Sequence, residues 1–109
     1  MIYLSATKIK NELLRNLPGV KDIAIKNHKI NGNNHGASGF MQYNDLIFYV
    51  SSDIDITFLH GKSLLIRKAK SMTDYCGETN NYTTLAELCA TIRVLEKNQK
   101  FFIAYTPKK

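Results

Sequence analysis

The residues best suited to chemistry lie in and around one polar segment, Ala69 to Tyr82, between an apolar run and a helix. A guanidinium pairs with phosphate oxygens as a fork, aromatic rings stack on nucleobases, and amides and carboxylates hydrogen-bond base edges and ribose hydroxyls. These residue types are therefore suited to a nucleotide. The candidate ligand-binding residues are Arg67 and Lys70 for phosphate, Tyr75, Tyr82 or Phe40 for stacking, Asp74 for ribose, and Asn80 or Asn81 for base edges.

The same segment also fits a simpler description as a capping turn. Gly77 and the adjacent asparagines are common turn formers, and Thr84 with Glu87 has the spacing of a capping box at a helix start. Tyr75 and Tyr82 suit packing anchors as well as they suit ligand contacts. Because loops held by a rigid scaffold are where binding residues concentrate, both interpretations stay open at this point.

Catalytic chemistry has little support in the sequence. An enzyme needs a nucleophile with a base, two differentiated carboxylates or a metal cluster, and no such set is recognisable. The glycines lack the spacing of a phosphate-binding loop, and the cysteines lack the spacing of metal ligands. We predict no catalytic residue, no metal and no cofactor. The enzyme alternative is a small hydrolase or nucleotide-processing enzyme that uses His35, His60 or Cys76.

Length and composition predict one globular domain, residues 1–109. Its formal net charge is +6, from 15 Lys and Arg against 9 Asp and Glu. The charge favours anionic partners such as phosphates. Because the basic residues are scattered and do not form one stripe on a helix, we expect a nucleic-acid partner to be unlikely. No segment is apolar enough for a membrane helix, and the amino end does not resemble a secretory signal. We expect no membrane association and a cytoplasmic location.

Periodicity predicts the elements of the first half. Apolar residues recur at helical spacing from Thr7 to Leu17, and Leu17-Pro18-Gly19 ends that helix. Val20 to Lys26 alternates like a half-buried strand. The asparagine-rich stretch from Asn27 to Ser38 is expected to be a loop or an irregular hairpin connection. Two short strands, Gly39 to Tyr43 and Leu46 to Val50, then form a hairpin around the turn Asn44-Asp45.

The second half is predicted to complete a two-layer domain. Asp53 to Phe58 is read as a strand or an extended loop, and Ser63 to Ala69 as a strand with Arg67 on the same side as Leu65. A helix follows from Thr84 to Asn98, with a final strand from Lys100 to Tyr105. The predicted fold class is α+β, with an antiparallel sheet of four to five strands packed by an N-terminal and a C-terminal helix.

The strand Leu46 to Val50 has five consecutive apolar residues, a pattern that indicates burial of both of its faces. One layer of helices covers only one face of a sheet. We therefore expect a second copy of the chain to cover the other face and predict a homo-oligomer.

Two blocks of the sequence resemble a known group of proteins. The first is Ser38-Gly39-Phe40 with Ile47 to Asp53, and the second is Arg67 to Tyr75 with Gly77 and the run from Asn80 to Leu88. Together they span Ser38 to Ile92 and are similar to small phage proteins of the Thoeris anti-defence sponge family. That family sequesters cyclic ADP-ribose signals and, in some members, cyclic oligonucleotides. Cys76-Gly77-Glu78 and the asparagine-rich segment depart from the family-like pattern, so the ligand is not identified.

The resemblance implies a phage anti-defence protein that acts in the host cytoplasm. It would bind and sequester a small nucleotide signal molecule without turnover, in an oligomer with pockets at protomer boundaries. Arg67, Asp74, Tyr75, Asn81 and Tyr82 match the family-like run and would be ligand contacts. The main alternative is a small protein-binding inhibitor or adaptor that acts on a host or phage protein. A weak nucleic-acid binder is a further possibility, distinguished by a steep salt dependence.

Overall fold

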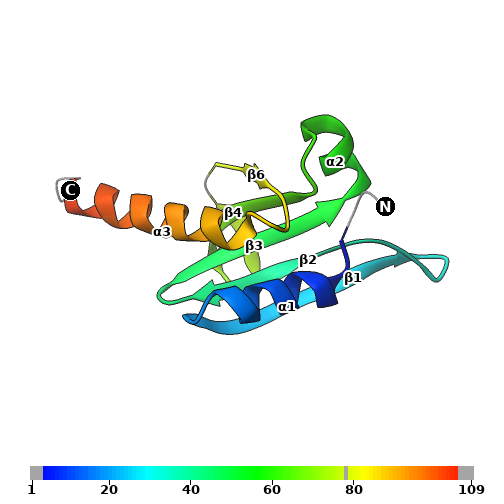
Figure 1. Ribbon diagram of the computed structural model, residues 1–109, viewed down its shortest axis with the longest axis horizontal. Coiled ribbons are helices and arrows are strands. Elements are labelled where there is room, and N and C mark those ends of the chain that lie inside the picture. Colours follow the sequence, from blue (N-terminus) through cyan, green and yellow to red (C-terminus); the bar gives the residue numbers. More distant parts are fainter. Residues whose placement is uncertain (1–3, 78, 106–109) are drawn as a thin grey trace.

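Figure 1 shows the computed structural model, in which the described residues are 4–77 and 79–105, without the side chains of residues 54, 55, 58, 75, 76 and 99–105. One antiparallel sheet forms the centre, and the helices α1 and α3 lie on the same side of it. The elements follow in the order α1 (Ala6–Asn16), β1 (Val20–Ile30), β2 (Asn33–Tyr43), β3 (Leu46–Asp53), α2 (Ile54–His60), β4 (Leu64–Ser71), β5 (Asp74–Gly77), β6 (Asn81–Thr83) and α3 (Leu88–Tyr105).

The sheet has the strand order β1-β2-β3-β4-β5, and β6 also pairs with β4. Since β5 and β6 pair with different parts of the same edge of β4, the sheet is five strands wide. Every pairing is antiparallel. The predicted α+β fold, with an N-terminal and a C-terminal helix on an antiparallel sheet, is confirmed.

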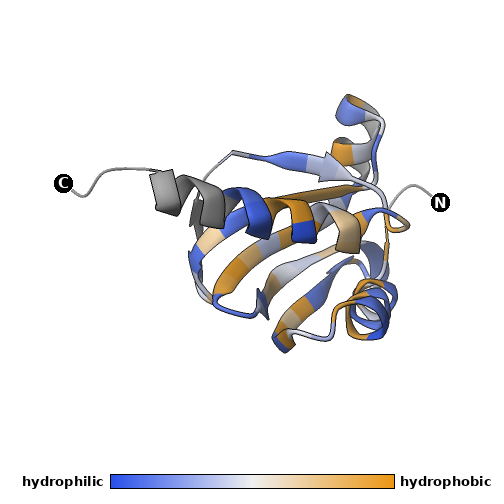
Figure 2. Cartoon of the chain, turned by 60° about the vertical axis from the view of Figure 1, so that its left-hand side comes forward, coloured by the Kyte–Doolittle hydropathy of each residue, from blue (hydrophilic) through white to orange (hydrophobic). Residues whose placement is uncertain are grey.

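Helix α1 forms as its pattern predicts. The Ser5 hydroxyl caps its start by accepting a hydrogen bond from the Lys8 backbone N–H at 3.3 Å. Ile9, Leu13 and Leu17 recur at helical spacing and are at most 1% exposed, so they fill the space between α1 and the sheet. In Figure 2, α1 alternates between hydrophobic and hydrophilic residues, as an amphipathic helix does.

The first hairpin is longer than predicted. The segment expected to be a loop between Asn27 and Ser38 is instead the end of β1, a two-residue turn and the start of β2. Asn31 and Gly32 both have positive φ, at 53° and 82°, which is the backbone geometry of a tight two-residue hairpin turn. The Asn-Gly pair was the available signal, because this pair adopts that geometry at low cost.

Two other predicted segments are helical instead of extended. After Asp53 the chain enters α2, because the Asp53 carboxylate accepts a hydrogen bond from the Ile56 backbone N–H at 2.8 Å and caps the turn. The predicted final strand from Lys100 to Tyr105 is wrong, since α3 continues through these residues. The helix predicted to start at Thr84 begins later, at Leu88, after a turn in which the Thr84 hydroxyl accepts a hydrogen bond from the Glu87 N–H at 3.3 Å.

The polar segment from Ala69 to Tyr82 is mostly strand, which corrects the prediction of a loop. Strand β4 continues to Ser71, a turn at Met72 and Thr73 reverses the chain, and β5 returns along β4. Strand β6 then pairs farther along the same edge of β4. The segment is thus the edge of the sheet, and alternation along it decides which side chains share a face.

The two faces of the sheet differ in what covers them. The face under α1 and α3, here called face A, carries the buried core, including Met41, Phe48, Val50 and Ile66, each 0% exposed. The opposite face, here called face B, carries the residues that alternate with these along the strands. Among the described residues no helix packs over the centre of face B, and α2 lies at one end of β3 and β4 (Figure 1).

A candidate nucleotide-binding surface on face B

Face B brings together side chains from three neighbouring strands. Phe40 on β2 pairs with Tyr49 on β3, and Tyr49 pairs with Arg67 on β4. Directly paired residues of an antiparallel sheet point to the same face, so the three side chains form one row across it. The Phe40 and Tyr49 rings are 5.5 Å apart between centroids and are tilted by 59°, a favourable aromatic arrangement.

The Arg67 guanidinium is held in a defined position within this row. Its central carbon lies 5.1 Å from the centroid of the Tyr49 ring, within the range of a cation–π interaction. Its Nη1 donates a hydrogen bond of 2.9 Å to the side-chain oxygen of Asn80. Arg67 and Tyr49 are half-buried, so the charge is partly shielded from water but remains accessible. A positive group held between a ring and an amide can receive an anionic ligand with little loss of side-chain freedom.

A second ring group lies beside this row on β6. Tyr82 pairs with Leu65 of β4 and therefore projects from face B. His60, the last residue of α2, stacks on the Tyr82 ring at a centroid distance of 3.7 Å and an interplanar angle of 17°. The Asn80 side chain contacts both Tyr82 and Arg67, because its Nδ2 donates to Tyr82 Oη at 3.5 Å while its oxygen accepts from Arg67. Asn80 therefore links Arg67 to the stacked pair.

The structure brings together four of the residues that the sequence singled out, namely Phe40, Arg67, Asn80 and Tyr82. Asn81 is directed to the other face, where it pairs with Ile66 and donates to the backbone oxygen of Thr79 at 3.0 Å.

The remaining predicted residues are more distant from this group. Lys70 is exposed and lies three positions after Arg67 on β4, at the irregularity between Ala69 and Ser71 in the pairing of β4 with β5. Asp74 pairs with Ser71, about 13 Å along the strand from Arg67 at about 3.3 Å per residue. The side chain of Tyr75 lies outside the described residues, and the same holds for Cys76.

Sequence reasoning missed two members of this surface. Tyr49 was read only as part of an apolar strand, although its alternation with Phe48 and Val50 already placed it on the second face. His60 was considered as a candidate hydrolase residue rather than as a stacking group. No local signal predicts its position, because the contact with Tyr82 joins the end of α2 to β6, two elements that are distant in sequence.

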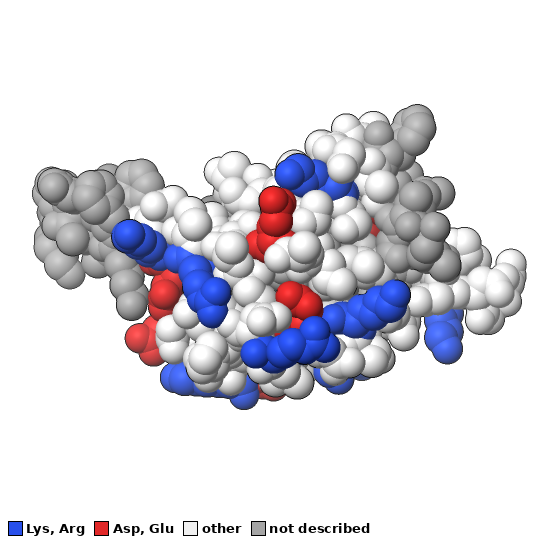
Figure 3. Space-filling view, in the orientation of Figure 1, with Lys and Arg blue, Asp and Glu red and all other residues white. Residues whose placement is uncertain are grey.

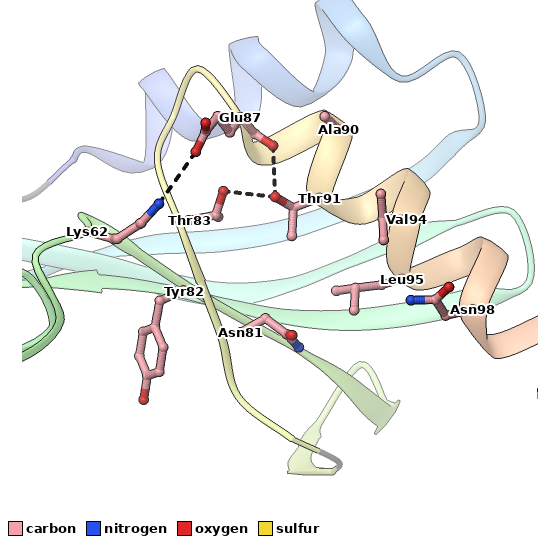
Figure 4. A pocket seen from close by; sticks show the side chains of 10 residues that line it. All are labelled: Lys62, Asn81, Tyr82, Thr83, Glu87, Ala90, Thr91, Val94, Leu95 and Asn98. Atoms are coloured by element: carbon pink, nitrogen blue, oxygen red, sulfur yellow. Dashed lines mark hydrogen bonds and ion pairs between the residues drawn. The ribbon is translucent and has the colours of Figure 1, made fainter.

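A separate cleft lies on the other side of β6, beneath α3 (Figure 4). It has a volume of about 480 Å³ and is bounded at one end by an ion pair of 3.7 Å between Lys62 and Glu87. Thr83 and Thr91 join across it through a hydroxyl contact of 2.9 Å. In Figure 4 Thr83 points toward α3 and the Tyr82 ring points away, which agrees with their assignment to faces A and B. The cleft therefore lies on the α3 side of β6, and Tyr82 borders both the cleft and the face B surface.

The charges on the helix-covered side do not define a binding site. Figure 3 shows its basic side chains separated by acidic and neutral ones. Among the described residues no group of three or more His, Cys, Asp or Glu could hold a metal ion. Cys89 is a free thiol, 5% exposed, and burial raises its pKa, with a further increase from Glu12 and an opposing effect of Arg93.

Comparison with known proteins finds no matching family model, curated protein or solved structure. Within residues 4–77 and 79–105, no helix combines the length and hydrophobicity needed to cross a lipid bilayer. The functional argument therefore depends on the geometry of face B.

Proposed function

We propose that the protein is a non-catalytic nucleotide-binding protein that holds its ligand on face B. The observation that supports this proposal is the row formed by Phe40, Tyr49 and Arg67, with Asn80 bonded to the guanidinium. Rings stack on any nucleobase, and a guanidinium binds phosphate oxygens. One short row thus offers both kinds of contact that a nucleotide needs.

The contacts assign a part of the ligand to each residue. The phosphate lies at Arg67, where it can accept from the guanidinium in place of the Asn80 oxygen. The base stacks on Tyr49 or Phe40 on one side of Arg67, or on the Tyr82 and His60 pair on the other. When Asn80 is displaced from Arg67, its amide becomes available to a base edge. These are the roles that the residue types predicted for Phe40, Arg67, Asn80 and Tyr82.

Binding without turnover is part of the proposal. Face B supplies a cation, rings and an amide, which recognise a nucleotide, and we assign none of them to bond cleavage. Together with the resemblance to the anti-defence sponge family, this leads us to propose that the protein withdraws a nucleotide from solution as a phage countermeasure. The predicted homo-oligomer stays a prediction, and light scattering on the free and the nucleotide-bound protein measures it directly.

The test compares two arginine variants that make the same chemical change on opposite sides of the molecule. Arg67→Gln removes the charge on face B, and Arg15→Gln removes a charge on α1, where the side chain is 71% exposed. Isothermal titration calorimetry with AMP, ADP, cyclic ADP-ribose and a cyclic dinucleotide measures the affinity of each variant. Chromatography of each ligand after incubation with the protein measures turnover.

We expect at least one of these nucleotides to bind and to remain intact. Arg67→Gln should weaken that binding at least about tenfold, since a charge-assisted contact is worth about 1.5–3 kcal/mol. Arg15→Gln should bind as the unmodified protein does. Equal losses in the two variants would show that only net charge matters, and the absence of binding to every nucleotide in the panel would reject the proposal.

A further inference from the structure

The ring groups on face B are too far apart for one nucleotide to use both. Tyr49 on β3 and Tyr82 on β6 are separated by β4, so two strand spacings lie between them, about 10 Å in total. Their β4 partners, Arg67 and Leu65, are two residues apart, which adds an offset of about 7 Å along the strand. The two ring groups are therefore about 12 Å apart on the sheet, with Arg67 between them.

This separation selects a particular arrangement of bases. Neighbouring bases stacked in a duplex strand advance by about 3.4 Å, much less than the spacing of the two ring groups. A ligand that contacts both groups must therefore have its bases separated and spread over the sheet. Unstacked bases on aromatic side chains, with phosphates between them, are the arrangement in which proteins recognise single-stranded nucleic acid.

A second row on face B extends the surface to the opposite edge of the sheet. Reading from β1 to β6, it consists of Lys26, Ser38, Ser51, Leu65 and Tyr82, each paired with the next. Lys26 is exposed and provides a cation on the far side of the sheet from Tyr82. Between these ends lie Ser38, Ser51 and Leu65, and the His28 ring joins the row beside Lys26, because its Nε2 lies 2.5 Å from the Ser38 hydroxyl.

We infer that face B binds a short single strand of nucleic acid that crosses the strands from Lys26 to Tyr82. The strand places one base on the Phe40 and Tyr49 rings, another on the Tyr82 and His60 pair, and phosphates at Arg67 and Lys26. This inference rests on the proposed nucleotide-binding function and adds that the preferred ligand is longer than a mononucleotide.

The scattered basic residues, from which the sequence predicted that a nucleic-acid partner is unlikely, argue only against binding of a duplex. A basic stripe along a helix serves a protein that contacts the two backbones of a duplex. Single-strand recognition uses a sheet face with rings, and it needs few cations because stacking supplies much of the contact. The antiparallel register creates that face, and the sequence does not display it.

The experiment measures fluorescence anisotropy with thymidine oligomers of one, two, four and eight nucleotides, and with an eight-base-pair duplex. We expect affinity to rise at least tenfold from one to four nucleotides and the duplex to bind at least tenfold more weakly than the eight-nucleotide strand. With phosphates at Arg67 and Lys26, the slope of log affinity against log salt should be about −1.4, at about −0.7 per contact. A cyclic dinucleotide and cyclic ADP-ribose are measured in parallel.

Two variants at Tyr82 locate the second ring group. Tyr82→Leu removes the ring, whereas Tyr82→Phe keeps it and removes only the hydroxyl that faces Asn80. The ratio of four-nucleotide to one-nucleotide affinity should fall at least fivefold in Tyr82→Leu and by less than twofold in Tyr82→Phe. Circular dichroism and thermal unfolding of each variant verify that the sheet is intact.

The outcomes separate this inference from the proposed function. If mononucleotides, cyclic ADP-ribose or a cyclic dinucleotide bind as tightly as the four-nucleotide strand, the single-strand inference fails and nucleotide binding stands. A salt slope steeper than about −3 would indicate binding by dispersed surface lysines and would overturn the assignment to face B. If no ligand binds at all, both the inference and the proposed function are rejected.

Discussion

The position of Arg67 over Tyr49 predicts an energetic coupling between these two side chains. The guanidinium carbon lies 5.1 Å from the ring centroid, and both residues are half-buried. Cation–π pairs are worth about 0.5–1 kcal/mol at exposed sites and about 2 kcal/mol when desolvated, so we expect about 1 kcal/mol here. The relevant perturbations are Tyr49→Leu and Arg67→Met, which remove the ring and the charge but keep apolar volume.

The coupling is measured by a double-mutant cycle in urea. Unfolding free energies of the unmodified protein, the two single variants and the double variant give the interaction term directly. The matched control pairs Tyr49→Leu with Arg15→Met, because Arg15 lies on α1 on the other side of the sheet. Those two changes should be additive within about 0.5 kcal/mol, as expected for distant sites.

If the effects of Tyr49→Leu and Arg67→Met are also additive, the predicted coupling between the Arg67 guanidinium and the Tyr49 ring is refuted. Additivity would mean that the guanidinium is not held against the ring in solution. In that case Arg67 would have to lose its side-chain freedom when the ligand binds, and the argument for a preformed anion site would no longer hold. A coupling near 1 kcal/mol would instead show that the cation is positioned before the ligand arrives.

Two further predictions concern the scaffold. Gly39→Ala would place a Cβ 2.0 Å from the Ala24 backbone oxygen, so the unfolding free energy should fall by at least about 3 kcal/mol. The control Gly32→Ala meets nothing within 4 Å, so its unfolding free energy should fall by only about 1–2 kcal/mol, because of the positive φ. Similar urea denaturation midpoints for the two variants would contradict the close β1–β2 contact. Because burial raises the Cys89 pKa above its ordinary 9.0, the stabilisation from the protonated thiol is complete below that pH and is lost as pH rises through the folded-state value. The unfolding free energy relative to Cys89→Ala should therefore fall as the pH rises above 9.0, and parallel pH curves would be inconsistent with the raised pKa.

Local patterns determined much of the scaffold. The spacing of Ile9, Leu13 and Leu17 was enough to predict α1, and the pair Thr84 and Glu87 marked the approach to α3. The alternation of β4 correctly placed Arg67 on the same side as Leu65. These features depend on residues a few positions apart, so their physical causes are present in the sequence itself.

Other elements were misread because competing local signals had similar strength. The alternating segment after Asp53 looks extended, yet a single capping carboxylate suffices to start α2. The aromatic run after Lys100 favours a strand by composition, yet it continues a helix that is already nucleated, and extending a helix costs less than starting a new element. In both cases the preference of the residues was weaker than the effect of the preceding turn.

The candidate site depended on the tertiary structure. Asn80, Asn81 and Tyr82 are neighbours in sequence, but the pairing of β6 with β4 sends Asn81 toward the core face and Tyr82 toward face B. The row that joins Phe40, Tyr49 and Arg67 exists only because three strands align in one register. The sequence thus determined which side chains were available, and strand register, which is set by contacts between distant residues, decided which of them share a surface.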